Sequence, residues 1–367
     1  MDIPPAAAGA HIPGSSRGQM KTENQTANLF RVAIVGAASL KGKELKDILE
    51  DRNFPAMDIR LLDDTEALGQ LDTVQDEVAF VQPVGRDQLT NVDFTFFAGE
   101  GEFTRAHWKM AREAGSSVVD LSYGLESEPA IPVCAPWIER ELGQPSQFNL
   151  ESTALVVAHP AATVLALLIL RAQKAGAVRF AAASVFEPVS EQGRRGMDEL
   201  HEQTVNLLSF QQMPTAVFDS QVAFNIIGRY GKTSAHPLEA IERRVGSHLR
   251  LLLGDRAPLP SLILLQAPVF HAYTFSVYVE LDKNVSAGDF TQAMAGEHVE
   301  IARGADDLPS NVNVAGKDQI LLALRRDTFH ANGFWLWAAV DNLRLAAITA
   351  VECATALAAV RPHGKVQ

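Results

Sequence analysis

The stretch Ala158-His159-Pro160-Ala161-Ala162-Thr163 lies where an apolar strand, residues 154–158, passes into an apolar helix. Proline suits the first turn of a helix, and the unpaired N–H groups there favour negative charge. A strand-to-helix turn of this kind is a common position for a catalytic nucleophile. Here the proline is followed by two alanines. The turn is therefore either an active site that lacks its reactive atom or a part of the core that never had one.

A second turn with chemical potential is Gly36-Ala37-Ala38-Ser39-Leu40-Lys41-Gly42, between an apolar strand at 32–35 and an amphipathic helix. Gly36 allows a tight turn and Gly42 allows close packing of helix on strand, as in dinucleotide-binding proteins. Ser39 occupies the position where a glycine would let the backbone approach a pyrophosphate most closely. The motif predicts a dinucleotide site, or a turn that keeps its glycines for packing.

Asp63 and Asp64 end the next predicted strand, about 20 residues beyond the glycine turn. A carboxylate at this position accepts hydrogen bonds from a ribose 2′-hydroxyl and repels a 2′-phosphate. If a dinucleotide binds, the pair favours NAD and disfavours NADP. The alternative is a solvated acidic loop.

Strands and helices alternate in the first part of the chain, which predicts a doubly wound parallel sheet. After residue 160 the alternation of apolar and polar residues within strands predicts an antiparallel or mixed sheet with one covered face. The predicted strands are 58–64, 92–102 and 116–122, and then 261–270, 275–281 and 319–327; a helix is expected over 339–360. The fold class is therefore α/β, with a Rossmann-like domain followed by a second sheet.

The composition narrows the class of protein. The net charge of −12 argues against binding to nucleic acid or to an anionic membrane. The two cysteines, Cys134 and Cys353, are far apart in the sequence and predict neither a disulfide framework nor a zinc site. We expect both to be buried structural thiols, in a cytoplasmic protein. No metal site is expected among the ten histidines. Residues 1–28 are expected to be a disordered tail.

Several stretches together resemble the aspartate-semialdehyde dehydrogenase family. They are VAIVGAASLKG (32–42), FFAGEGE (96–102), VSEQGRRGMDEL (189–200), QVAFNI (221–226), QAPVF (266–270) and FWLWAAVDNLR (334–344). The resemblance implies a dinucleotide-binding domain over 29–160 and 341–362, and a central α+β dimerisation domain with a mixed sheet over 161–340. It also implies a homodimer and cofactor contacts from Gly99 and Asn342.

The family reaction passes through a cysteine thioester, and the residues that it requires differ here. In the matching positions Ala162 replaces the cysteine nucleophile and Tyr273 the basic histidine. Gln266 replaces the arginine that binds the substrate carboxylate, and Glu126 replaces the arginine that binds phosphate. Arg244 keeps the expected charge.

The preferred hypothesis is a catalytically degenerate homologue, acting as a dimeric scaffold or an NAD-sensing regulator with an unknown protein partner. An alternative is an oxidoreductase that transfers hydride without a covalent intermediate, with Tyr273, His271, His159 and Glu187 as its candidate groups. A working aspartate-semialdehyde dehydrogenase is the third reading, and it would require a cysteine at position 162.

The loop 187–196 is more charged than the family's small, glycine-rich loop. It contains Glu187, Glu191, Arg194 and Arg195, and we expect these side chains to be solvated.

Overall fold

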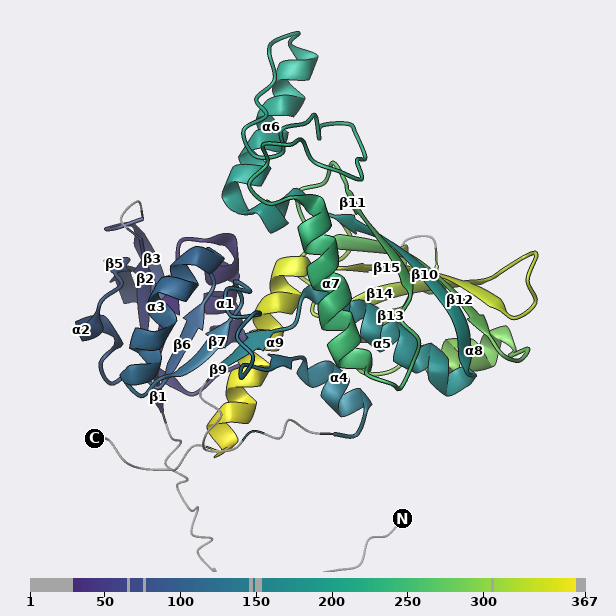
Figure 1. Cartoon of the computed structure of the whole chain (residues 1–367), viewed down its shortest axis with the longest axis horizontal. Coiled ribbons are helices and arrows are strands. Elements are labelled where there is room, and N and C mark those ends of the chain that lie inside the picture. The colour runs from purple at the N-terminus through teal and green to yellow at the C-terminus, as the bar shows by residue number, and fades with distance from the viewer. Residues whose placement is uncertain are drawn as a thin grey trace, which may run out of the picture.

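The computed structural model describes residues 29–64, 67–74, 77–144, 148, 154–304 and 307–360. The predicted tail at 1–28 lies outside this range, as do residues 361 and 362 of the predicted first domain. The described residues form two large sheets that lie side by side, with helix α9 (Asn342–Val360) between them (Figure 1), and a small two-stranded sheet. The domain boundaries at 160/161 and 340/341 stay a prediction.

The first sheet is parallel and has seven strands in the order β5-β2-β1-β6-β7-β9-β8. Its centre is fully buried: every residue of β6 and β7 lies between helices on both faces, and Asp120 at the end of β7 is the one charged residue among them. The strands are β1 (Phe30–Val35), β2 (Ala56–Asp63), β5 (Gln82–Pro83), β6 (Phe94–Phe97), β7 (Ser117–Asp120), β8 (Val133–Cys134) and β9 (Ala154–Val157). The predicted parallel sheet is confirmed.

Four helices belong to this half of the molecule, and a small hairpin stands beside them. The helices are α1 (Leu40–Asp51), α2 (Arg86–Leu89), α3 (Gly101–Glu113) and α4 (Pro136–Glu141), and the hairpin joins β3 (Leu71–Val74) to β4 (Glu77–Phe80). The strand predicted over 92–102 is shorter than expected, since Gly101 already begins α3.

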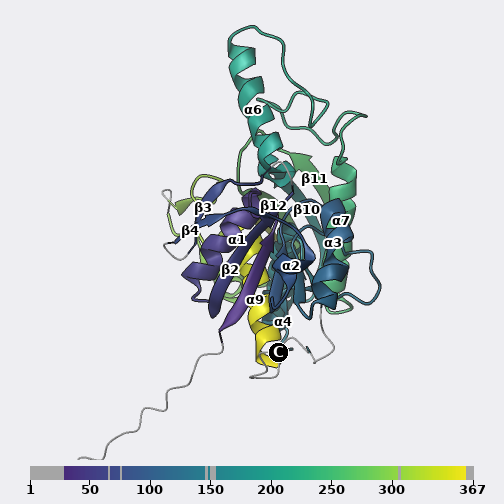
Figure 2. The same cartoon turned by 90° about the vertical axis from the view of Figure 1, so that its left-hand side faces the viewer.

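The second sheet is mixed, as predicted, and its strands have the order β11-β10-β12-β15-β14-β13. Its strands are β10 (Val178–Glu187), β11 (Ser261–Gln266), β12 (Tyr273–Leu281), β13 (Val299–Ile301), β14 (Ile320–Arg326) and β15 (Gly333–Val340). Its helices are α5 (Pro160–Ala175), α6 (Gly193–Leu208), α7 (Leu238–Leu253) and α8 (Ala287–Met294), with a short 3-10 turn, η1 (Val189–Gln192). Helix α6 projects from the rest of the molecule (Figures 1 and 2).

The two faces of the mixed sheet differ in how far their side chains are buried. Alternate residues such as Val277 and Leu336 are buried on the face that α5 covers. On the opposite face a row of paired residues crosses four strands, from Ile263 through Ser184 and Ser276 to Trp337. Ile263 is 48% exposed and Trp337 is 40% exposed. Among the residues that the structure describes, no helix covers this row, which is a partly apolar surface.

Helix α9 joins the two halves. It packs against α1 and α4, and Arg344 near its start pairs with Glu44 and Asp51 of α1 and with Asp318 of the second half. The predicted helix 339–360 starts later than expected, because residues 339 and 340 complete β15. Among the described helices α9 is the one long and apolar enough to cross a membrane, but 61% of its apolar window is buried, as in a core helix.

Candidate functional site

A cavity of about 960 Å³ follows the carboxyl edge of the parallel sheet. Its lining runs from Asp63 after β2, past Gly36 after β1 and Gly99 after β6, to Tyr123 after β7 and His159 after β9. Adjacent strands lie about 4.8 Å apart, so these positions extend over roughly 19 Å. The carboxyl edge of an open α/β sheet is where such folds bind ligands.

The glycine turn is built for close approach of backbone. Gly36 has φ +84°, and a Cβ on it would lie 2.3 Å from the Gly99 nitrogen. A Cβ on Gly42 would lie 2.2 Å from the Gly36 carbonyl oxygen. Ser39 caps α1: its hydroxyl accepts a hydrogen bond from the Gly42 N–H and donates one to the Ala98 carbonyl, both at 2.9 Å. Gly36, Ser39 and Gly99 line the cavity, whereas Gly42 holds the turn from behind.

Asp63 is tied to the glycine turn and is not a freely solvated loop residue. Its carboxylate accepts a hydrogen bond from the Ala38 N–H at 2.8 Å. Burial raises its pKa from the ordinary value, although the N–H groups of Ala38 and Asp64 lower it. Asp63 and Asp64 both line the cavity, so two carboxylates meet any ligand at the β2 end.

The turn at 158–163 has the predicted geometry: β9 ends at Val157 and α5 begins at Pro160. His159 is the N-cap, and its Nδ1 accepts a hydrogen bond from the Ala161 N–H at 3.3 Å. Ala162 is fully buried and is not among the residues that line the cavity. A histidine ring thus lies where the helix start would otherwise open to the cleft.

Aromatic rings close this end of the cavity. Tyr123 is stacked on His159 at 5.3 Å between ring centres, and the Lys41 and Arg244 cations each lie 4.7 Å from the centre of its ring. Burial raises the pKa of Tyr123 to about 12, against the opposing effect of Lys41. Burial and the nearby cations hold the pKa of His159 well below its ordinary value. Both rings are therefore neutral at pH 7.

Arg244, a cation at the His159 end of the cavity, is already paired with a carboxylate. Arg244 donates two hydrogen bonds to Glu126, at 2.7 and 3.0 Å, in a bidentate pair. His248 lies beside them, with its Nε2 3.7 Å from a Glu126 oxygen and without a hydrogen-bond partner. Because the His159 N–H donates to His248 Nδ1 at 3.0 Å, Nε2 is the nitrogen that carries the proton.

Comparison with known proteins identifies the family. Residues 31–144 match the NAD-binding domain of semialdehyde dehydrogenases, and residues 169–345 match their dimerisation domain. A Pseudomonas aeruginosa protein named USG-1 protein homolog is 34% identical over 88% of this chain and 96% of its own length. The chain belongs to the aspartate-semialdehyde dehydrogenase family.

Solved structures of family members agree with this assignment. A probable aspartate-semialdehyde dehydrogenase from Pseudomonas aeruginosa superposes with a TM-score of 0.80 at 31% identity, covering 90% of this chain and 98% of that one. Aspartate-semialdehyde dehydrogenase II from Vibrio cholerae gives 0.79 at 25% identity, covering 90% and 99%. The predicted fold, a Rossmann-like domain followed by a dimerisation domain with a mixed sheet, is confirmed.

Two of the positions where the family's catalytic groups are expected form a closed cluster behind the cavity. Tyr273 and Gln266 are fully buried, and both contact the carboxyl group of Glu187 or its backbone. Tyr230 donates a hydrogen bond of 2.5 Å to the Gln266 side-chain oxygen, and its hydroxyl oxygen lies 3.4 Å from a Glu187 carboxyl oxygen. Burial, with a contribution from Glu191, raises the pKa of Glu187 to about 8. None of these groups lines the cavity except Glu191.

The expectation that loop 187–196 is solvated was wrong for its acidic residues. Glu187 is fully buried, and the side chain of Glu191 is only 5% exposed because it pairs with Lys41 at 3.7 Å. Asn342 donates to Glu191 at 2.8 Å and accepts from the Ala272 N–H, and it is not among the cavity-lining residues. Arg194 and Arg195 do line the cavity.

Sequence reasoning missed Tyr123, Lys41, His248 and Tyr230. The only local signal was the position of Lys41 inside the glycine turn and of Tyr123 directly after a predicted strand.

His271 is half-buried and lies outside the cavity lining. Cys134 and Cys353 are buried free thiols, as expected. Within the ranges that the structure describes, no three His, Cys, Asp or Glu side chains gather in a way that could hold a metal ion.

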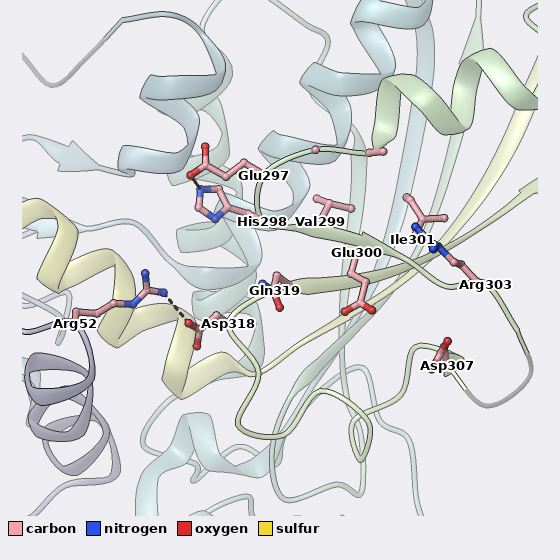
Figure 3. A pocket seen from close by; sticks show the side chains of 12 residues that line it. Arg52, Glu297, His298, Val299, Glu300, Ile301, Arg303, Asp307, Asp318 and Gln319 are labelled. Carbon is pink, nitrogen blue, oxygen red and sulfur yellow. Dashed lines mark hydrogen bonds and ion pairs between the residues drawn. The ribbon is translucent and has the colours of Figure 1, made fainter. Parts of the chain in front are cut away.

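A second cavity, of about 880 Å³, lies at the outer edge of the mixed sheet beside β13 (Figure 3). Charged side chains line it, and two of them, Arg52 and Asp318, form an ion pair at 2.7 Å. Burial lowers the pKa of His298, 3.4 Å from Glu297, to about 4. The residues predicted to bind a cofactor do not line it, so the cavity along the parallel sheet is the candidate site.

Replacing Glu187 with Gln should remove a pH dependence of stability. With a folded pKa of about 8, this carboxyl group is protonated in the folded chain while the unfolded chain ionises it above about pH 4.5. The difference between the free energies of unfolding of wild type and variant should therefore change with pH. Between pH 5 and pH 8 the wild type should lose roughly 3–4 kcal/mol relative to the variant. Denaturant melts at both pH values measure this.

Glu102→Gln is the control, because this side chain is 95% exposed. Parallel stability curves for wild type and Glu187→Gln would contradict the buried, protonated state of Glu187.

Proposed function

We propose that this chain is a catalytically degenerate member of the aspartate-semialdehyde dehydrogenase family, a dimeric scaffold or NAD-responsive regulatory protein of the cytoplasm. The observation that carries the proposal is the turn before α5. A methyl group, that of Ala162, stands where the family's thiol is expected, and it is buried behind His159. A methyl group cannot form a thioester.

The surrounding charges support the same conclusion. Glu126 neutralises Arg244, the retained cation, through two hydrogen bonds. Gln266 stands in the position of the carboxylate-binding arginine. Its side-chain amide donates hydrogen bonds to the backbone carbonyl oxygens of Glu187 and Ala267. An anionic acyl-phosphate substrate would therefore meet the Glu126 carboxylate beside an Arg244 guanidinium that is already paired.

The alternative of hydride transfer without a covalent intermediate receives less support. Tyr273 and Glu187 do converge, at 3.4 Å, but both are fully buried and outside the cavity lining. A proton donor must reach the substrate within hydrogen-bond distance, directly or through one water.

Restoring the thiol alone should not restore the reaction. We expect Ala162→Cys to show no phosphate-dependent oxidation of aspartate semialdehyde, because the base and both anion contacts are still missing. Loss of one member of a catalytic unit typically costs about 10⁴-fold or more in rate. The assay follows NADH and NADPH absorbance, with a family enzyme as positive control. Turnover by the wild-type chain would refute the proposal.

The retained glycine turn supports nucleotide binding, with NAD preferred to NADP. We expect NAD to bind at least ~10-fold more tightly than NADP, a difference of about 1.4 kcal/mol, because a 2′-phosphate would face Asp63 and Asp64. Titration calorimetry measures both ligands. Asp63→Ser should reduce the preference, whereas Asp58→Asn, in a half-exposed carboxylate outside the lining, should leave it unchanged. Equal affinities in the wild type would contradict the role of Asp63.

The uncovered face of the mixed sheet is the surface on which we place the dimer contact. Ser276 lies at the middle of the exposed row, paired with Ser184 and Trp337. Ser276→Arg should convert a dimer into a monomer at micromolar concentration, since a buried unpaired charge opposes association. Analytical ultracentrifugation measures this, with Leu71→Arg, 66% exposed on the other half, as control. A monomeric wild type would refute the dimer.

A further inference from the structure

Helix α6 and the chain that follows it form an arm, residues 193–227, which projects from the rest of the molecule (Figures 1 and 2). The 16 residues of α6 extend over about 24 Å at 1.5 Å per residue. Both ends of the arm are attached beside the edge strand β11. Just before α6, the Ser190 N–H donates to the Phe270 carbonyl oxygen at 3.0 Å, and at the other end Ile227 exchanges two backbone hydrogen bonds with Gln266.

Two buried polar side chains of α6 hold the arm together. Glu199 accepts hydrogen bonds from the N–H groups of Val217 and Phe218, at 2.6 and 3.2 Å. Gln203 makes four more, at 2.8–3.1 Å, to backbone groups between residues 214 and 223. Because these buried side chains satisfy the backbone of the loop, the loop is fixed to its helix.

The same arm presents apolar side chains to solvent. Leu208 and Phe210, at its outer end, are 70% and 99% exposed, and Phe224 and Ile226, near its return to the sheet, are 68% and 58% exposed. Phe210 and Phe224 each have φ +56°, a left-handed backbone conformation that is rare for bulky residues. Strained backbone of this kind is found mainly at functional and binding sites. An ordered arm that exposes large apolar side chains is therefore typical of an interaction surface.

We infer that the arm binds a second copy of this chain and extends the dimer contact that we place on the uncovered face of the mixed sheet. This inference rests on the proposed dimer. The segment that matches the family's dimerisation domain, residues 169–345, contains the whole arm. In Figure 1, α5 and α8 lie below the strands of the mixed sheet, whereas α6 rises above them, on the side of the uncovered face. A copy that covers this face therefore lies beside the arm.

The sheet face by itself offers a partner little apolar area. Its central pair, Ser184 and Ser276, is polar, and Ile263 and Trp337 are only partly exposed. A stable interface buries about 800 Å² on each partner, so the contact needs further surface. The exposed apolar side chains of the arm supply it on the same side of the molecule. In a two-fold dimer each arm meets the other copy, so the arm contributes to the interface twice.

Sedimentation velocity over a dilution series of the full chain measures the dissociation constant of the dimer. We expect Leu208→Ser combined with Phe210→Ser to raise this constant about 30-fold or more, as the loss of interface anchors typically does. The matched control is Leu71→Ser combined with Phe80→Ser, an exposed leucine and phenylalanine on the β3–β4 hairpin of the other half. The control should leave the dissociation constant unchanged.

The outcomes separate the arm from the dimer. An unchanged dissociation constant in the arm variant would overturn this inference and leave the proposed dimer intact, and an equal rise in the control would overturn the assignment to the arm. The arm variant should keep the circular dichroism spectrum and thermal midpoint of the wild type, because both replaced side chains are exposed. Loss of its fold would overturn the exposed placement on which the inference rests. If the wild type is a monomer at micromolar concentration, the proposed dimer fails and this inference fails with it.

Discussion

Burial of helix α5 is the constraint on which both halves of the molecule depend. Every residue from Pro160 to Ala172 is buried, and the helix packs against α4, α7, α8 and α9 as well as against β10 and β12. Each large apolar side chain buried there contributes about 1.5–3 kcal/mol. Selection for folding therefore preserves the strand-to-helix turn before α5 whether or not it carries a reactive group. The opening of a helix toward a cleft is by itself no evidence of catalysis.

The charges around that turn are arranged to satisfy one another. Glu126 pairs with Arg244, and Glu191 pairs with Lys41. Glu187 is buried without a cation and keeps its proton instead. A catalytic cleft keeps cations ready for the substrate, whereas here carboxylates of the chain itself occupy the inner ones. At this end of the cleft the two inner cations, Lys41 and Arg244, are held in internal ion pairs.

The opposite end of the cleft is shaped by close backbone contacts at the glycine turn. The contact of Gly36 with Gly99 leaves no room for a Cβ, and Ser39 caps α1 while holding the next strand through the Ala98 carbonyl. Ser39 thus stands at a position where glycine is usual without blocking the turn, because both hydrogen bonds of its hydroxyl are made to backbone groups.

The sequence by itself determined the order of elements, the glycine turn, the aspartates after β2 and the alanine at position 162, because each is a local pattern or a single residue in a recognisable stretch. It could not show that Glu126 pairs with Arg244, separated by 118 residues, or that Tyr123 stacks on His159. The prediction from sequence was also wrong for Glu187. A charged side chain in a polar stretch is expected to be solvated, but the packing of β10 and β12 buries this one. Ion pairing, stacking and burial depend on which distant elements meet, and only the tertiary structure decided that.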